Sequence, residues 1–119
     1  MVKPIALTLG EPAGIGPDIA IAAWLRRKSA PVPAFYLLGD RNYIVTRARL
    51  LGVDIPLADA AADDALGIFA DALPVVATGQ SASARPGHPD ENSAAAAIGS
   101  IRRAVDDVAA GHAAAVVTN

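Results

Sequence analysis

The chain is predicted to form an α/β fold of three layers, with a mostly parallel sheet between two layers of helices. Apolar runs of strand length alternate with helical patterns along the 119 residues, and this alternation is typical of parallel α/β sheets. A glycine-rich turn at 10–17 joins the first apolar run to a helical pattern. The longest helical pattern, at 92–110, leads into a further apolar run.

The first predicted unit is a strand, a tight turn and a helix. The apolar run at 5–9 suits a buried strand, and the glycines that follow permit turns and close approaches that a Cβ would block. Pro17 suits the first turn of a helix, where its missing N–H has no partner to lose. The helix is predicted over 18–28, with four residues facing inward: Ile19, Ala22, Ala23 and Trp24.

A second strand and a second helix are predicted at 34–38 and 41–51. The helix is expected to present Arg47 and Arg49 to solvent. Gly52 is expected to end it, because glycine adopts the left-handed conformation that often follows a helix.

The middle of the chain alternates less clearly. A short third strand is predicted at 53–57 and is assigned to an edge of the sheet, because Pro56 has no N–H to donate. The acidic, alanine-rich stretch 59–71 fits a short helix or a loop. A fourth strand is predicted at 73–77, and 79–90 is the longest irregular stretch.

The best-defined element is the helix predicted at 92–110. Asn92 or Ser93 is expected to cap its start, and Gly111 to follow its end. Apolar residues that recur at steps of four and three are expected to face the sheet: Ala94, Ile98, Ile101, Val105 and Val108. A fifth strand is predicted at 112–117.

Composition excludes several classes of function. The formal net charge of −2 leaves no basic surface for nucleic acid. Without cysteine there are neither disulfides nor thiolate metal ligands, which fits a reducing cytoplasm. No apolar run approaches the roughly 20 residues of a membrane helix, so a cytoplasmic protein without a membrane partner is expected.

The candidate site is the turn between the first strand and the first helix. Free N–H groups and the helix dipole at such a position suit a phosphate, a carboxylate or a nucleotide. The glycine spacing matches neither the dinucleotide fingerprint nor the P-loop, and a plain structural turn stays an open alternative. Residues at the carboxyl ends of the first and fifth strands are candidates for a substrate cleft: Gly10, Glu11, Pro12, Gly14, Gly16, Thr118 and Asn119.

The two histidines do not form a recognisable metal motif. His88 lies in a loop and His112 at a predicted strand start, with neither paired spacing nor a thiolate between them. Solvent-facing histidines are the favoured interpretation. No residue is therefore assigned to a metal or to catalysis, and Asp90 and Glu91 are expected to balance the dipole of the long helix.

Two segments carry a resemblance to a known family. The apolar run 4–9 and Asp18 flank an octapeptide that resembles the opening of the 4-hydroxythreonine-4-phosphate dehydrogenase family: Gly10-Glu11-Pro12-Ala13-Gly14-Ile15-Gly16-Pro17. The segments 99–105 and 111–119 are similar to the helix, turn and strand that lead into a Thr-x-Pro-x-x-Lys segment in this family. The sequence stops at Asn119, within that segment.

The resemblance implies a fold like the N-terminal part of isocitrate and isopropylmalate dehydrogenases. It implies a homodimeric enzyme of pyridoxal phosphate synthesis that oxidises and decarboxylates a small phosphorylated substrate, 4-phosphooxy-threonine, with NAD or NADP. A divalent metal, zinc, magnesium or cobalt, would polarise the new carbonyl. The family's metal-binding and substrate-binding segments lie downstream, so 1–119 is interpreted as a partial α/β domain that is inactive alone.

Other functions stay open at this point. Relatives that act on threonate phosphate or on an aromatic dihydrodiol share the opening motif. A different class is a small α/β module that binds an anion through the loop 10–17 without catalysis.

Overall fold

The computed structural model describes residues 2–82 and 84–119. Within these residues the chain forms one five-stranded sheet in the order β3-β4-β2-β1-β5, and each pair of neighbouring strands is parallel. The mostly parallel α/β fold predicted from the sequence is confirmed. The strands are β1 (Ile5–Thr8), β2 (Phe35–Leu38), β3 (Leu57–Asp59), β4 (Leu73–Val76) and β5 (Val116–Val117).

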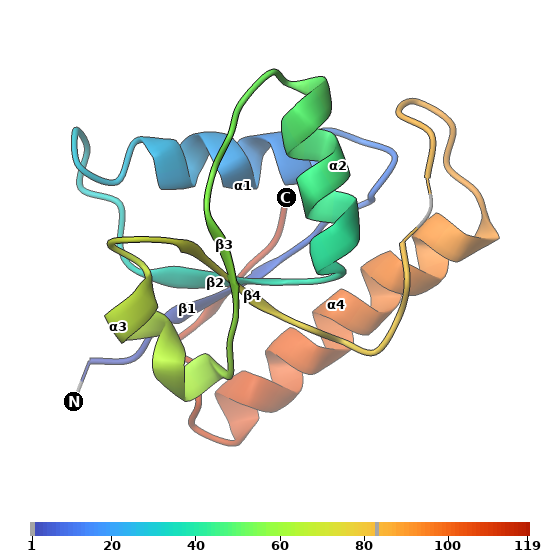
Figure 1. Cartoon of the computed structure of the whole chain (residues 1–119). Helices are drawn as coiled ribbons and strands as arrows, with labels where there is room; N and C mark the ends of the chain where they lie inside the picture. Colours follow the sequence, from blue (N-terminus) through green and yellow to red (C-terminus); the bar gives the residue numbers. More distant parts are fainter. Residues whose placement is uncertain (1, 83) are drawn as a thin grey trace.

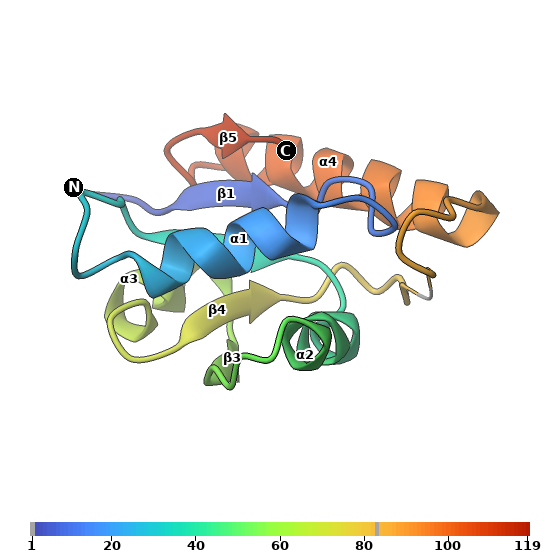
Figure 2. The same cartoon turned by 90° about the horizontal axis from the view of Figure 1, so that it is seen from above.

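Helices cover both faces of the sheet, which gives three layers (Figure 1). One face carries α1 (Gly16–Leu25) and α2 (Arg41–Leu50), and the other carries α4 (Glu91–Ala109) with α3 (Ala65–Ile68). A 3₁₀ turn, η1 (Ala62–Asp64), precedes α3. The chain runs from β1 through β2 to β3 over the first face and returns through β4 to β5 over the second, as right-handed crossovers require. The turned view in Figure 2 shows β5 and β3 at the two edges of the sheet.

The two faces of the sheet bury different kinds of side chain. Leu7 and Leu37 pack beneath α1 and α2 together with Trp24, whose indole N–H donates to the Phe69 carbonyl at 2.9 Å. The other face is built largely from small residues of α3 and α4 around Tyr36. The prediction that Trp24 belongs to the core is confirmed.

The inward face of α1 is only partly the predicted one. Trp24 is buried, but the other residues that accompany it are Ala20 and Ile21. Ile19 is 46% exposed and Ala22 is exposed, so the prediction was wrong for these two. Ile19 lines an open groove beside Val117 on β5, where α1 reaches the edge of the sheet.

The start of α4 is capped by Asp90, and the prediction of Asn92 or Ser93 was wrong by two to three residues. The Asp90 carboxylate accepts the Ser93 N–H at 2.8 Å, and the Ser93 hydroxyl accepts the Asp90 N–H at 2.9 Å. This reciprocal pair is a capping box. The glycines predicted to follow α2 and α4 are confirmed, because Gly52 and Gly111 have φ of 72° and 83°.

The face that α4 turns to the sheet was predicted wrongly. Its buried residues are Ser93, Ala96, Ser100, Ala104 and Asp107. The predicted inward residues Ile98, Ile101 and Val105 are 51%, 44% and 53% exposed, Ala94 is exposed, and Val108 alone packs partly against the core. The reason is close approach: the Ser100 hydroxyl accepts the Leu9 N–H and donates to the Leu38 carbonyl, each at 2.9 Å. Only small side chains fit at that separation.

The remaining differences concern short elements. β3 begins at Leu57 instead of Val53, although its edge position is as predicted, and the ambiguous stretch 59–71 holds η1 and α3. β5 is shorter than predicted because the N–H groups of His112 and Ala113 donate to the Asp107 carbonyl in a turn. Within the described residues, no helix is both long and apolar enough to span a membrane.

Candidate functional site

The loop 10–17 lies at the carboxyl edge of the sheet. β1 and β5 are neighbouring parallel strands, so the segments that follow them meet at the same edge. In open α/β sheets, ligands bind in crevices beyond the carboxyl ends of the strands. The loop follows β1, and Thr118 and Asn119 follow β5. The structure therefore brings together the two segments from which the candidate cleft residues were drawn.

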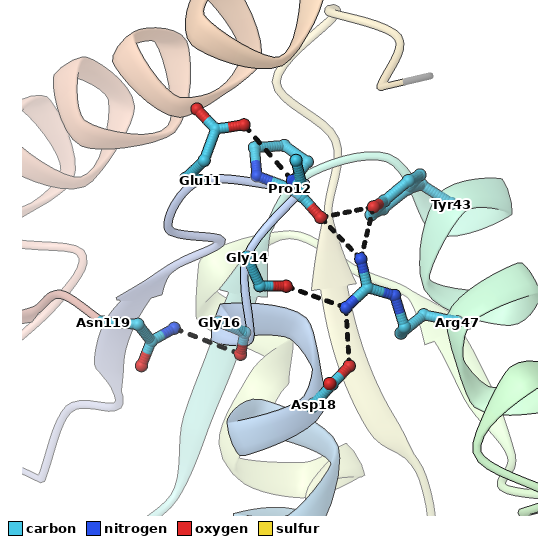
Figure 3. Close-up of polar contacts among 9 residues, drawn as sticks. Glu11, Pro12, Gly14, Gly16, Asp18, Tyr43, Arg47 and Asn119 are labelled. Atoms are coloured by element: carbon cyan, nitrogen blue, oxygen red, sulfur yellow. Dashed lines mark hydrogen bonds and ion pairs between the residues drawn. The ribbon is translucent and has the colours of Figure 1, made fainter. Parts of the chain in front are cut away.

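Asn119 ties the end of β5 to the loop. Its side-chain amide donates to the Thr8 carbonyl at 3.0 Å. It also donates to the Gly16 carbonyl at 3.4 Å, the contact drawn in Figure 3. A Cβ on Gly16 would lie 2.4 Å from the Leu9 carbonyl oxygen, which no side chain can tolerate. Gly10 has a φ of 71° and its Cβ position lies 3.2 Å from the Asn119 Cβ. Both glycines are thus required by this close approach.

The other candidates have different roles. The Glu11 carboxylate accepts the Ala13 N–H at 3.2 Å, and the Glu11 carbonyl accepts the Gly14 N–H at 2.9 Å. Glu11 therefore stabilises the loop itself. Pro12 is buried, Thr118 is exposed, and a Cβ on Gly14 would meet the Glu11 carbonyl at 3.3 Å, a far milder contact than at Gly16.

A buried arginine holds the loop from the α2 side, and the sequence analysis missed it. Arg47 is 4% exposed. One of its terminal nitrogens donates to the Gly14 carbonyl at 2.9 Å and to the Asp18 carboxylate at 2.7 Å, and the other donates to the Pro12 carbonyl at 2.6 Å and to the Tyr43 hydroxyl at 2.7 Å (Figure 3). The Tyr43 hydroxyl in turn donates to Pro12.

The predicted solvent exposure of Arg47 was therefore wrong, whereas that of Arg49 is confirmed. The sequence signal that could have predicted its burial was its position on the helix. Arg47 shares the buried face of α2 with Tyr43, Ile44 and Ala48, and an arginine on an apolar helical face needs a buried partner.

The charge of Arg47 is neutralised within the protein. Burial alone would lower the pKa of Arg47, but the hydrogen bonds that Arg47 donates to Asp18 and Tyr43 outweigh it and raise the pKa above its usual range. The guanidinium therefore stays charged, and the Asp18 carboxylate at 2.7 Å balances it.

The start of α1 differs from the starts of α2 and α4. Asp40 and Asp90 cap those two helices through their side chains, while in the described part of the chain no side chain caps α1. The positive end of the α1 dipole is consequently directed at the loop without a side-chain acceptor. An anionic group fits such a position.

Comparison with known proteins identifies relatives over the whole chain. No protein-family model matches it. Over 98% of its length it is 58% identical to the 4-hydroxythreonine-4-phosphate dehydrogenase of Bradyrhizobium diazoefficiens and 47% identical to that of Xanthobacter autotrophicus. The chain is homologous to the 4-hydroxythreonine-4-phosphate dehydrogenases. The resemblance predicted from the opening octapeptide is confirmed.

The homologous region is a fraction of these dehydrogenases. The chain covers 36% and 33% of the two relatives, so it spans about a third of the length of the curated relatives it matches. The crystal structure of a 4-hydroxythreonine-4-phosphate dehydrogenase from Burkholderia phymatum superimposes with a TM-score of 0.81 at 17% identity, over 99% of this chain and 36% of that one. That likeness shows that the fold is the same.

The histidines lie apart from each other, at the two ends of α4. The segment that carries His88 contacts the loop, because the Gly87 N–H donates to the Ala13 carbonyl at 2.7 Å. His88 is exposed in the segment before α4, and His112 follows its end, 3.3 Å from the Asp63 carboxylate. Among residues 2–82 and 84–119, no three His, Cys, Asp or Glu side chains gather in a way that could hold a metal ion. The described part of this dehydrogenase homologue therefore does not fit a metal centre.

Proposed function

We propose that this chain is the part of a 4-hydroxythreonine-4-phosphate dehydrogenase that forms one wall of the substrate cleft. The observation that carries the proposal is the whole-length match at 58% identity to a relative of that name. The position of the loop 10–17 beyond the carboxyl end of β1, in contact with the end of β5, supports the assignment of the cleft.

The proposed reaction is the oxidation of the secondary alcohol of 4-phosphooxy-threonine by NAD or NADP, after which the carboxylate β to the new ketone leaves as carbon dioxide. A divalent metal, zinc, magnesium or cobalt, would act as a Lewis acid for that chemistry. Since the described residues do not fit a metal centre, we derive no step through the metal and assign no catalytic residue here. The role of this chain is to bind and to orient.

Binding rests on the loop and on Asn119. Gly10 and Gly16 let the backbone of the loop approach β5 closely, and Asn119 holds that approach through two carbonyls. The uncapped start of α1 favours an anionic group. The phosphate of the substrate is the group that we assign to this position.

The proposal includes a homodimer in the cytoplasm. Two exposed apolar surfaces of the chain support its assembly with other protein surfaces. One is a groove of about 210 Å³ beside β5, lined by residues that include Ile5, Leu7, Phe35 and Val117. The other is the outer face of α4, where Ile98, Ile101 and Val105 are exposed.

The test is an assay of the full-length polypeptide that carries this chain. We expect reduction of NAD or NADP with 4-phosphooxy-threonine, and about a tenfold higher KM after Asn119→Ala, because one hydrogen-bonded contact to the loop is lost. Asn92→Ala, at an exposed asparagine of α4, is the matched control and should change neither kcat nor KM.

Three results would contradict parts of this proposal. Turnover of threonate phosphate or of an aromatic dihydrodiol in place of 4-phosphooxy-threonine would assign the related specificity. Binding of inorganic phosphate without turnover of any of these substrates would assign a non-catalytic anion-binding module. Turnover by the 119-residue chain alone would contradict the expectation that it is inactive.

A further inference from the structure

We infer that Arg47 is a positioning residue, which fixes the shape of the loop 10–17 and acts on the ligand only through that shape. The inference rests on hydrogen bonds between residues within this chain. The identity of the ligand rests on the proposed function.

The donors of Arg47 are already used within the protein. An arginine has four N–H groups on its two terminal nitrogens. In Arg47 these reach Gly14, Asp18, Pro12 and Tyr43. With these donors engaged and the side chain 4% exposed, Arg47 is not placed to bind an anion itself.

The contacts fix the direction of two peptide groups. Arg47 holds the carbonyls of Pro12 and Gly14 on the α2 side of the loop (Figure 3). In a trans peptide the N–H points away from the carbonyl, and the described chain has no cis peptide bond. The N–H groups of Ala13 and Ile15 therefore point away from Arg47.

These two N–H groups have different surroundings. That of Ala13 is taken by the Glu11 carboxylate at 3.2 Å. Ile15 is the N-cap residue of α1, where no side chain of the described residues provides a cap. Arg47 thus determines the direction of the N–H that opens α1, which is the end of the helix assigned to the substrate phosphate.

Two further residues make the arrangement rigid. Tyr43 donates to the Pro12 carbonyl while it accepts from Arg47, so Pro12 is held by two side chains of α2. Asp18 lies on α1 and binds Arg47 at 2.7 Å. One guanidinium therefore joins α2, the loop and α1. Lysine cannot replace it, since an ammonium offers three donors at a single point and no planar fork.

The experiment compares four variants of the full-length polypeptide. Arg47→Met removes the fork, Arg47→Lys retains the charge, Tyr43→Phe removes one contact to Pro12, and Arg49→Met is the matched control at an exposed arginine of the same helix. Steady-state kinetics are combined with hydrogen–deuterium exchange of peptides that cover 10–19 and with thermal unfolding.

In Arg47→Met we expect at least a tenfold rise of KM, at least a tenfold fall of kcat, and faster exchange confined to 10–19. Arg47→Lys should recover less than a tenth of the lost kcat/KM. Tyr43→Phe, which retains the guanidinium and so keeps the fold, should raise KM about threefold. Arg49→Met should match the wild type within twofold.

The inference is overturned if Arg47→Met or Tyr43→Phe lowers the unfolding temperature but leaves kcat, KM and loop exchange of the folded enzyme unchanged. It is also overturned if Arg47→Lys restores full activity. Absence of dehydrogenase activity in the wild type would count against the proposed function instead, because the exchange of 10–19 still reports on the role of Arg47.

Discussion

Two buried polar networks lie at opposite ends of the sheet, and they join different kinds of groups. At the carboxyl end, Arg47 donates to the backbone carbonyls of an irregular loop. At the amino end, the Asp107 carboxylate on α4 accepts the Tyr36 hydroxyl of β2 at 2.6 Å and the Arg103 side chain at 2.9 Å. The first network binds side chains to backbone carbonyls as well as to other side chains, whereas the second binds side chains to side chains.

The difference indicates what each network controls. The backbone groups of α4 are paired within the helix and those of β2 with its neighbouring strands, so the contact between Asp107 and Tyr36 sets only where α4 sits on the sheet. The backbone of the loop 10–17 has no such ladder, and its Pro12 and Gly14 carbonyls take their partners from Arg47 and Tyr43. Substitutions in the network at the amino end should therefore lower the free energy of unfolding. Substitutions at the carboxyl end should alter the conformation of the loop 10–17 and, with it, the kinetic constants.

The largest effect is expected from Gly16→Val at the carboxyl end. The new Cβ would lie 2.4 Å from the Leu9 carbonyl oxygen, so the loop must move away from β1 and Asn119. We expect at least a 100-fold loss of kcat/KM in the full-length enzyme, measured with 4-phosphooxy-threonine. Gly67→Ala, where a Cβ meets nothing within 4 Å, is the control. Unchanged turnover in Gly16→Val would show that the loop 10–17 is not part of the substrate site.

The amino end should respond to Asp107→Ala with a loss of stability. The variant leaves the buried Tyr36 hydroxyl without its acceptor, which costs about 1–3 kcal/mol. Denaturant unfolding measures this loss, and Asp106→Ala at the exposed neighbouring position is the matched control. Kinetic constants of the folded enzyme should stay at the wild-type value. A large fall in kcat/KM would show that the two ends are coupled.

Tyr36 should make stability depend on alkaline pH. Burial raises the pKa of the Tyr36 hydroxyl, and the hydrogen bond to Asp107 raises it further. The folded state therefore keeps this proton above about pH 10, where an unfolded tyrosine loses it. The contribution is present below about pH 10 and is lost as the pH rises above it, by up to about 1.4 kcal/mol per pH unit. Tyr36→Phe should unfold with a shallower alkaline decline, and an identical decline would contradict the assignment.

The smallest effect is expected from Thr8→Val, at the last residue of β1. The Thr8 hydroxyl is buried and has no hydrogen-bond partner among the described residues. Removing an unsatisfied buried hydroxyl at nearly constant shape should change the free energy of unfolding by less than about 1 kcal/mol, toward greater stability. Thermal and denaturant unfolding measure it. A loss of substrate affinity in this variant would instead show that the hydroxyl serves the cleft.

Local signals in the sequence predicted the loop 10–17 and the order of strands and helices. Gly10, Gly52 and Gly111 have the positive φ that only glycine adopts readily. The structure brings the candidate cleft residues of the loop next to Asn119, because parallel strands end at the same edge of a sheet. Their role in binding substrate stays a prediction.

Helix faces were predicted less well, for a physical reason. Hydrophobic periodicity identifies residues that share a face, and the strongest stripe on α4 is that of Ile98, Ile101 and Val105, which is exposed. The opposite stripe, around Ser100 and Ala104, packs on the sheet because small side chains allow the helix to approach closely. Periodicity alone carries no information about that distance.

By itself the sequence determined the α/β class, the sequence of elements, the glycine turn after β1 and the family resemblance, since each depends on residues close together in the chain. The tertiary structure alone decided that α4 packs through its small residues and that Arg47 is buried against Pro12 and Gly14. Those outcomes depend on partners more than 30 residues away. The local sequence around an arginine in a helix is the same whether its side chain contacts water or a backbone carbonyl.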